Sequence, residues 1–112
     1  MKSLLKSIQY DMLDFIEGED EGDADYTSED VKLCITGLLE FMSSMASEAQ
    51  TLESSKEHVK TVVLSLNSLN HQCGDCLIET DQREDICEFI KKVMSAANVV
   101  FSGDITEEWR EW

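Results

Sequence analysis

The chain has 112 residues, 42% of them hydrophobic, a length that favours one domain with one core. It carries 24 acidic residues against nine basic ones, for a formal net charge of -15. The hydrophobic content excludes wholesale disorder. The negative charge repels nucleic acid and anionic membranes and attracts basic proteins, so direct nucleic-acid binding is the least favoured function.

The composition also favours helices. The chain contains no proline and only five glycines, so few positions forbid a helix. The first 11 residues include Lys6, Gln9 and Asp11 where a signal peptide needs an unbroken apolar segment, and no run approaches the roughly 18 apolar residues of a membrane span. We therefore expect a cytoplasmic protein with reduced thiols.

The first predicted element is an amphipathic helix over residues 2–17. Its apolar face comprises Leu4, Leu5, Ile8, Met12, Phe15 and Ile16. A membrane-surface helix prefers a basic polar face, whereas this one leads directly into a block of carboxylates. The pattern therefore favours packing into a core.

An acidic surface loop is expected next, over about residues 17–27. It contains two glycines and no basic residue, and mutual repulsion disfavours regular structure there. Its spacing excludes an EF-hand, because Ser28 stands where glycine is needed and Cys34 where a bidentate glutamate is needed. Two interpretations remain, a solvated run of charge or a docking surface for a basic partner.

A central helix is predicted over residues 28–52, with Thr27 or Ser28 as its N-cap and Glu29 and Asp30 in its first turn. Its apolar residues recur at steps of three and four: Val31, Cys34, Ile35, Leu38, Leu39, Phe41, Met42, Met45, Ala49 and Leu52. Such a wide stripe predicts contacts on more than one side.

Gly37 interrupts this pattern at a cost of about 1 kcal/mol relative to alanine. Either another helix crosses closely at that point or the element is in two pieces. A short strand over residues 31–36 is a competing interpretation, because Leu33 and Ile35 alternate with Cys34 and Thr36.

A third helix is expected after Ser54, since residues 54–57 match the capping box with Ser54 as N-cap and Glu57 three positions later. Its buried face comprises Val59, Val62, Val63, Leu66, Leu69 and Cys73. Gly74 stands where a left-handed residue would end the helix.

A fourth helix is predicted with Asp81 as its cap. Its buried face comprises Ile86, Phe89, Ile90, Val93, Met94 and Ala97. Residues 102–103 break the pattern, and Asp104 is expected to cap a short final helix through Trp112. The predicted architecture is an all-α, four-helix antiparallel bundle with a short C-terminal helical tail, in a single domain over 1–112.

Cys73 and Cys76 form the one sequence pattern associated with redox or metal chemistry. A redox pair is normally activated at a helix N-terminus, whereas this pair follows the end of a helix in an acidic field that raises the thiol pKa. A zinc site needs a second closely spaced pair of ligands, which the sequence lacks. Ordinary structural cysteines are favoured over a metal or redox site.

We find no nucleophile signature, phosphate loop or zinc-protease motif in the sequence. The expectation is therefore a protein that is not an enzyme, with no catalytic residue, no metal and no cofactor. Trp109 and Trp112 lie among carboxylates near the end of the chain, and tryptophan often anchors interfaces. The alternative is that both indoles fold back over the bundle.

In size, acidity and expected helix content the chain resembles cytosolic immunity proteins, although no motif carries the resemblance. This resemblance implies an inhibitor that neutralises a basic toxin, such as a nuclease, by covering its cationic surface. The predicted partner-binding residues are Glu19, Asp20, Glu21, Asp23, Asp25, Glu29, Asp30, Trp109 and Trp112. Two alternatives are a homodimeric helical adaptor and an acidic nucleic-acid mimic that blocks a DNA-binding enzyme.

Overall fold

The structure, a computed structural model, describes residues 2–18, 27–74, 77–101 and 103–112. Within these residues the chain forms helices and no strand. The helices are α1 (Lys2–Gly18), α2 (Ser28–Ala46), α3 (Leu52–Gln72) and α4 (Thr80–Ala96). The all-α prediction is confirmed, and residues 31–36 belong to a helix and not to the competing strand.

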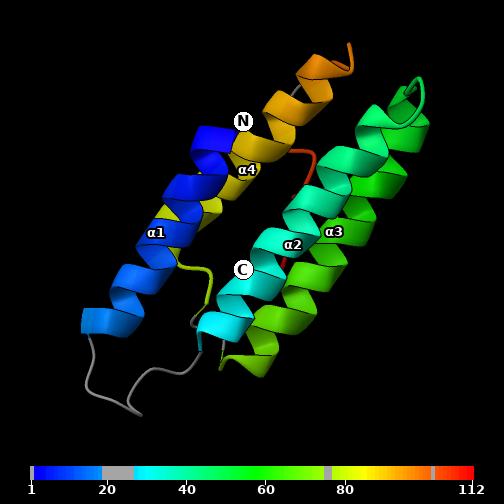
Figure 1. Cartoon of the computed structure of the whole chain (residues 1–112). Coiled ribbons are helices and arrows are strands. Elements are labelled where there is room, and N and C mark those ends of the chain that lie inside the picture. The colour runs from blue at the N-terminus through cyan, green and yellow to red at the C-terminus, as the bar shows by residue number, and fades with distance from the viewer. Residues whose placement is uncertain (1, 19–26, 75–76, 102) are drawn as a thin grey trace.

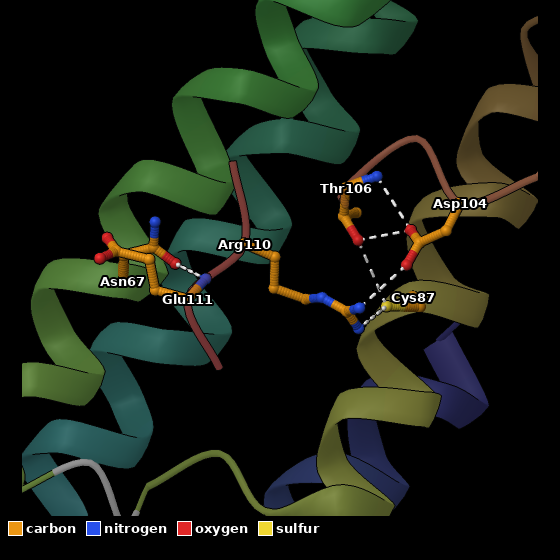
Figure 2. A network of polar contacts seen from close by, with 6 residues as sticks. All are labelled: Asn67, Cys87, Asp104, Thr106, Arg110 and Glu111. Carbon is orange, nitrogen blue, oxygen red and sulfur yellow. Dashed lines mark hydrogen bonds and ion pairs between the residues drawn. The ribbon is translucent and has the colours of Figure 1, made fainter. Parts of the chain in front are cut away.

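Each helix runs in the direction opposite to the one before it, as the colour gradient shows (Figure 1). α2 contacts all three other helices, α1 also packs on α4, and α3 packs chiefly on α2. The expectation that the central helix meets neighbours on more than one side is therefore confirmed. The C-terminal segment passes between α3 and α4 and covers that side of the bundle (Figures 1 and 2).

The core takes its residues from every helix and from the C-terminal segment. α1 contributes Leu5, Ile8 and Met12, while the side chains of Phe15 and Ile16 lie outside the described part. The predicted faces of α3 and α4 are buried as expected, apart from Ala97, which is partly buried.

The buried face of α2 is narrower than the sequence indicates. It comprises Val31, Cys34, Leu38, Phe41 and Met45. Leu39 and Leu52, both predicted to be buried, are 41% and 40% exposed. Ile35 and Met42 lie at the edge of the face and are partly buried.

α2 ends at Ala46 and does not continue to residue 52. Ser47 satisfies the carbonyl of Ser44 through both its N–H and its hydroxyl, the latter at 2.8 Å. The Gln50 side-chain amide donates to the Met45 carbonyl at 3.3 Å. These polar side chains take up helix-end carbonyls, so the chain turns although the apolar spacing continues.

The N-cap of α3 is Thr51, so the prediction of Ser54 is wrong by one turn. The Thr51 hydroxyl accepts from the Ser54 N–H at 3.1 Å, and the Ser54 hydroxyl accepts from the Thr51 N–H at 2.9 Å. Thr27 and Asp30 form the same reciprocal arrangement at the start of α2. Serine takes the place of the usual glutamate in the capping box of α3, so the sequence pattern does not identify Thr51 as the cap.

α4 begins after Glu79, and Asp81 lies in its first turn instead of capping it. The Glu79 N–H donates to the Gln82 side-chain carbonyl at 3.2 Å. Gln82 satisfies this end of the helix from the third helical position, so an aspartate is not required as the cap.

Residues with positive φ end two of the helices. Gly74, at φ 67°, follows α3 as predicted. Asn98, at φ 61°, follows α4, where the Val99 N–H donates to the Met94 carbonyl and the Asn98 N–H to the Ser95 carbonyl. This is a Schellman motif with asparagine in place of glycine, and it stops α4 well before residues 102–103.

The predicted final helix over residues 104–112 is wrong, because the segment forms hydrogen-bonded turns, from Glu107 to Asp104 and from Trp109 and Arg110 to Thr106, that do not continue as a helix. The Asp104 carboxylate accepts from both the N–H and the hydroxyl of Thr106. The Asn67 amide of α3 then donates to the Trp109 carbonyl at 2.7 Å. It also accepts from the Glu111 N–H at 3.1 Å (Figure 2). The Glu111 N–H, which a helix through Trp112 would pair with the Glu107 carbonyl, is held instead by a side chain of α3.

Two buried asparagines one turn apart on α3 therefore fix two connecting segments. Asn67 is 3% exposed and holds the C-terminal segment. Asn70, also 3% exposed, accepts from the Ile78 N–H at 2.9 Å and holds the segment that leads into α4. A buried amide with its partners in place specifies a single arrangement of the chain around it.

Gly37 has neither of the two expected roles. α2 is continuous through it, and a Cβ built at this position would meet nothing within 4 Å. No helix crosses closely enough to require a glycine. Gly37 therefore destabilises the helix, and no close packing at this position requires a glycine.

Replacing Gly37 with alanine should increase the free energy of unfolding by about 1 kcal/mol, because alanine loses less backbone entropy in a helix. The midpoint of thermal unfolding, followed by circular dichroism, should rise by roughly 4 °C. Gly103→Ala is the matched control: its surroundings are equally open but its φ is +91°, so this variant should be less stable. A neutral or destabilising Gly37→Ala would contradict the open environment.

Replacing Asn67 with alanine should lower the free energy of unfolding by about 2–3 kcal/mol, because two hydrogen bonds to the C-terminal segment are lost. The chain has two tryptophans, both in that segment, so their emission should shift to the red as it loosens. Urea denaturation followed by fluorescence measures both effects. Ser68→Ala, at an exposed position of α3, should not lower the stability and should leave the emission unchanged.

Candidate functional site

The structure describes only some of the predicted partner-binding residues. Glu19, Asp20, Glu21, Asp23 and Asp25 lie outside the described residues. Glu29 is exposed in the first turn of α2, whereas Asp30 is partly buried and accepts from the Thr27 N–H at 2.9 Å. Asp30 therefore has a structural role as part of the cap, and the docking role of these residues remains a prediction.

Trp109 and Trp112 are both partly buried and pack against the core. The Arg110 guanidinium lies 5.6 Å from the centre of the Trp112 ring. This placement is compatible with the interpretation that the indoles fold back over the bundle. Their use as anchors for a partner remains a prediction.

Arg110 joins the C-terminal segment to α4. Its guanidinium pairs with the Asp104 carboxylate at 3.2 Å and lies 3.7 Å from the Cys87 sulfur (Figure 2). The Thr106 hydroxyl lies 3.6 Å from the same sulfur. With Asn67 on the α3 side, this network holds the segment between the two helices.

The structure brings together four carboxylates at the boundary between α1 and α4, and we call Asp11, Asp81, Glu84 and Asp85 the α1–α4 acidic cluster. Burial raises the pKa of Asp85 above its ordinary value, and the charges of Asp11, Asp81 and Glu84 raise it further. These three neighbours act from both helices. The cluster is thus a place where negative charge is concentrated at a cost to the folded state.

Tyr10 is an exposed aromatic residue on the same helix as Asp11. It precedes Asp11 in the chain and is 70% exposed. Tyrosine is enriched at protein interfaces, where its ring supplies contact area and its hydroxyl a hydrogen bond. The surface formed by Tyr10 and the α1–α4 acidic cluster is the strongest candidate for partner binding among the described residues.

Sequence analysis missed this surface. It singled out the contiguous acidic run, whereas the cluster joins two helices from opposite ends of the sequence. The detectable signal was that Asp11 and Asp85 each lie beside the apolar face of their helix. Bringing them together requires the pairing of α1 with α4, which the periodicity of neither helix specifies.

The described cysteines are poor candidates for chemistry. Cys34 and Cys73 are buried, and Cys76 lies outside the described residues. Burial raises the pKa of Cys34 to about 12, with a further contribution from Cys73. Burial also raises the pKa of the half-buried Cys87. These two groups are therefore protonated thiols at neutral pH, and thiols are far weaker nucleophiles and ligands than thiolates.

In the part of the chain that the structure describes, no group of three or more His, Cys, Asp or Glu side chains is arranged to hold a metal ion. None of the described helices combines the length and apolarity that crossing a bilayer requires. Comparison with protein-family models, with curated proteins and with solved structures found no match for the chain.

Asp85→Asn should stabilise the protein at pH 7 by up to about 0.5 kcal/mol, because it removes a charge that is disfavoured by burial and repelled by its neighbours. A raised pKa means that the folded state binds this proton more tightly than the unfolded state. The stability linked to Asp85 is thus fully present below its unfolded pKa and is lost as the pH rises through the folded pKa.

The advantage of the variant should consequently vanish near pH 3, where the carboxyl is already protonated. Urea denaturation at the two pH values measures this difference. Glu108→Gln, at an exposed position outside the cluster, should match the parent at both. An equal gain at pH 7 and pH 3 would show that the charge of Asp85 is not the cause.

Proposed function

We propose that this protein is a stoichiometric inhibitor that binds a basic protein, in the manner of immunity proteins that neutralise a toxin such as a nuclease. The observation that carries the proposal is the α1–α4 acidic cluster, with the exposed Tyr10 directly preceding Asp11 in α1. Stability alone would not favour a partly buried carboxylate, Asp85, with three further carboxylates close enough to raise its pKa. A cationic partner would relieve this repulsion on binding.

The overall charge supports the same proposal through kinetics. A net charge of -15 attracts a cationic protein over a distance of about a Debye length and increases the association rate. A nuclease groove is shaped to receive phosphates, and carboxylates can occupy it in their place. Inhibition would then follow from covering the groove, with no chemical step.

The test mixes the protein with a panel of cationic nucleases and with lysozyme as a cationic protein that is not a nuclease. Light scattering after size exclusion gives the stoichiometry, and nuclease assays give the inhibition. We expect a one-to-one complex with a nuclease and an association rate that falls steeply with salt. A tight dimer of the chain alone, insensitive to salt, would favour the homodimeric adaptor.

A double variant, Asp11→Asn with Asp85→Asn, locates the surface. It should weaken binding by about tenfold or more, since two charges at the contact are lost. Glu107→Gln with Glu108→Gln removes the same charge from exposed positions of the C-terminal segment and should weaken binding less than about twofold. Equal effects would place the contact elsewhere, and no binding to any cationic protein at low salt would remove the basis of the proposal.

A further inference from the structure

An apolar cleft lies at the end of the bundle where α2 and α4 both terminate. Its volume is about 360 Å³. Met42 and Met45 of α2 form one wall, and Val93 and Ala96 of α4 form another. The two helices run in the same direction, so their C-terminal ends lie at the same end of the molecule (Figure 1).

The electrostatics of this cleft are negative. Each helix ends with the partial negative charge of its macrodipole, and neither α2 nor α4 has a basic residue in its last turn to compensate it. The one charged side chain that lines the cleft is Glu48. Apolar walls therefore stand beside a source of negative potential.

This combination matches the chemistry of an arginine or lysine side chain. Such a side chain has an apolar stem that gains from burial and a cationic head that must stay near solvent or negative charge. Methionine walls adapt to the shape of a stem, and the volume is at the lower end of ligand sites, enough for one side chain. A carboxylate would be repelled, and a neutral apolar group would gain nothing from the helix ends.

We propose that the cleft between the C-terminal turns of α2 and α4 binds an arginine or lysine side chain of a basic protein. The stem would lie between Met42 and Val93, with the head near Glu48 and the helix ends. That this side chain belongs to a basic protein partner rests on the proposed function. The recognition of a cationic side chain by the cleft is tested separately, with a small probe.

The probe is n-butylguanidinium, which reproduces the stem and head of arginine. Methionine methyl groups labelled with carbon-13 report binding by nuclear magnetic resonance. The signals of Met42 and Met45 should shift with saturation, with a Kd on the order of millimolar. Met12, which is buried and does not line the cleft, is the internal reference and should not shift.

Three matched probes separate the contributions. Guanidinium lacks the stem, n-pentanol lacks the charge and pentanoate carries the opposite charge. Each should bind at least about fivefold more weakly than n-butylguanidinium, and pentanoate most weakly of all. Equal binding of n-pentanol, or no shift of either methyl signal up to about 50 mM n-butylguanidinium, would overturn the proposal.

Variants at exposed positions keep the test independent of folding. Glu48→Gln should weaken n-butylguanidinium about fivefold, whereas Glu57→Gln, outside the cleft, should not. Ala96→Leu fills the cleft and should abolish binding while the circular dichroism spectrum is unchanged. Parent-like affinity in Ala96→Leu would show that the probe binds elsewhere and would overturn the proposal.

The outcomes distinguish this proposal from the inhibitor function. If n-butylguanidinium binds but no basic protein does, the recognition of a cationic side chain by the cleft is supported and the inhibitor function is refuted. Binding of a basic nuclease with equal affinity to the parent and to Ala96→Leu would leave the inhibitor function standing and overturn the role of the cleft in it.

Discussion

The fold depends on one polar side chain buried in the C-terminal half of α3. α3 packs chiefly on α2 and α4 on α1, so the bundle has a side that helices alone do not cover. Asn67 allows the C-terminal segment to cover that side, because its amide matches the donor and acceptor of an irregular backbone. A buried amide is favourable only when both of its functions are used. Here both are, by two residues far away in the sequence.

The helices themselves were largely predictable from the sequence. The buried faces of α3 and α4 follow from their spacing, and Gly74 correctly marks the end of α3. The errors lie at helix ends, where polar side chains compete with the periodic pattern. Gln50 and Ser47 end α2 although apolar residues continue beyond it, and Asn98 ends α4 in a position normally taken by glycine.

The C-terminal segment shows the limit of periodicity as a guide. Ile105, Trp109 and Trp112 have helical spacing, and Asp104 is a good capping residue. The spacing carries no information about Asn67, whose amide holds this segment in a non-helical path. The same limit applies to the candidate surface, because Asp11 and Asp85 meet only through the pairing of two helices. Long-range partners decide both features, and a local pattern does not identify them.

The order of synthesis gives the arrangement around Asn67 a consequence for biogenesis. Residues 104–112 leave the ribosome after all four helices, so a nascent chain has its helices before it has the segment that covers α3 and α4. Until then the apolar groups beneath Ile105 and Trp109 face solvent or a chaperone. The partly synthesised bundle is therefore more prone to aggregation than the folded bundle, and the arrival of residues 104–112 ends this vulnerable period.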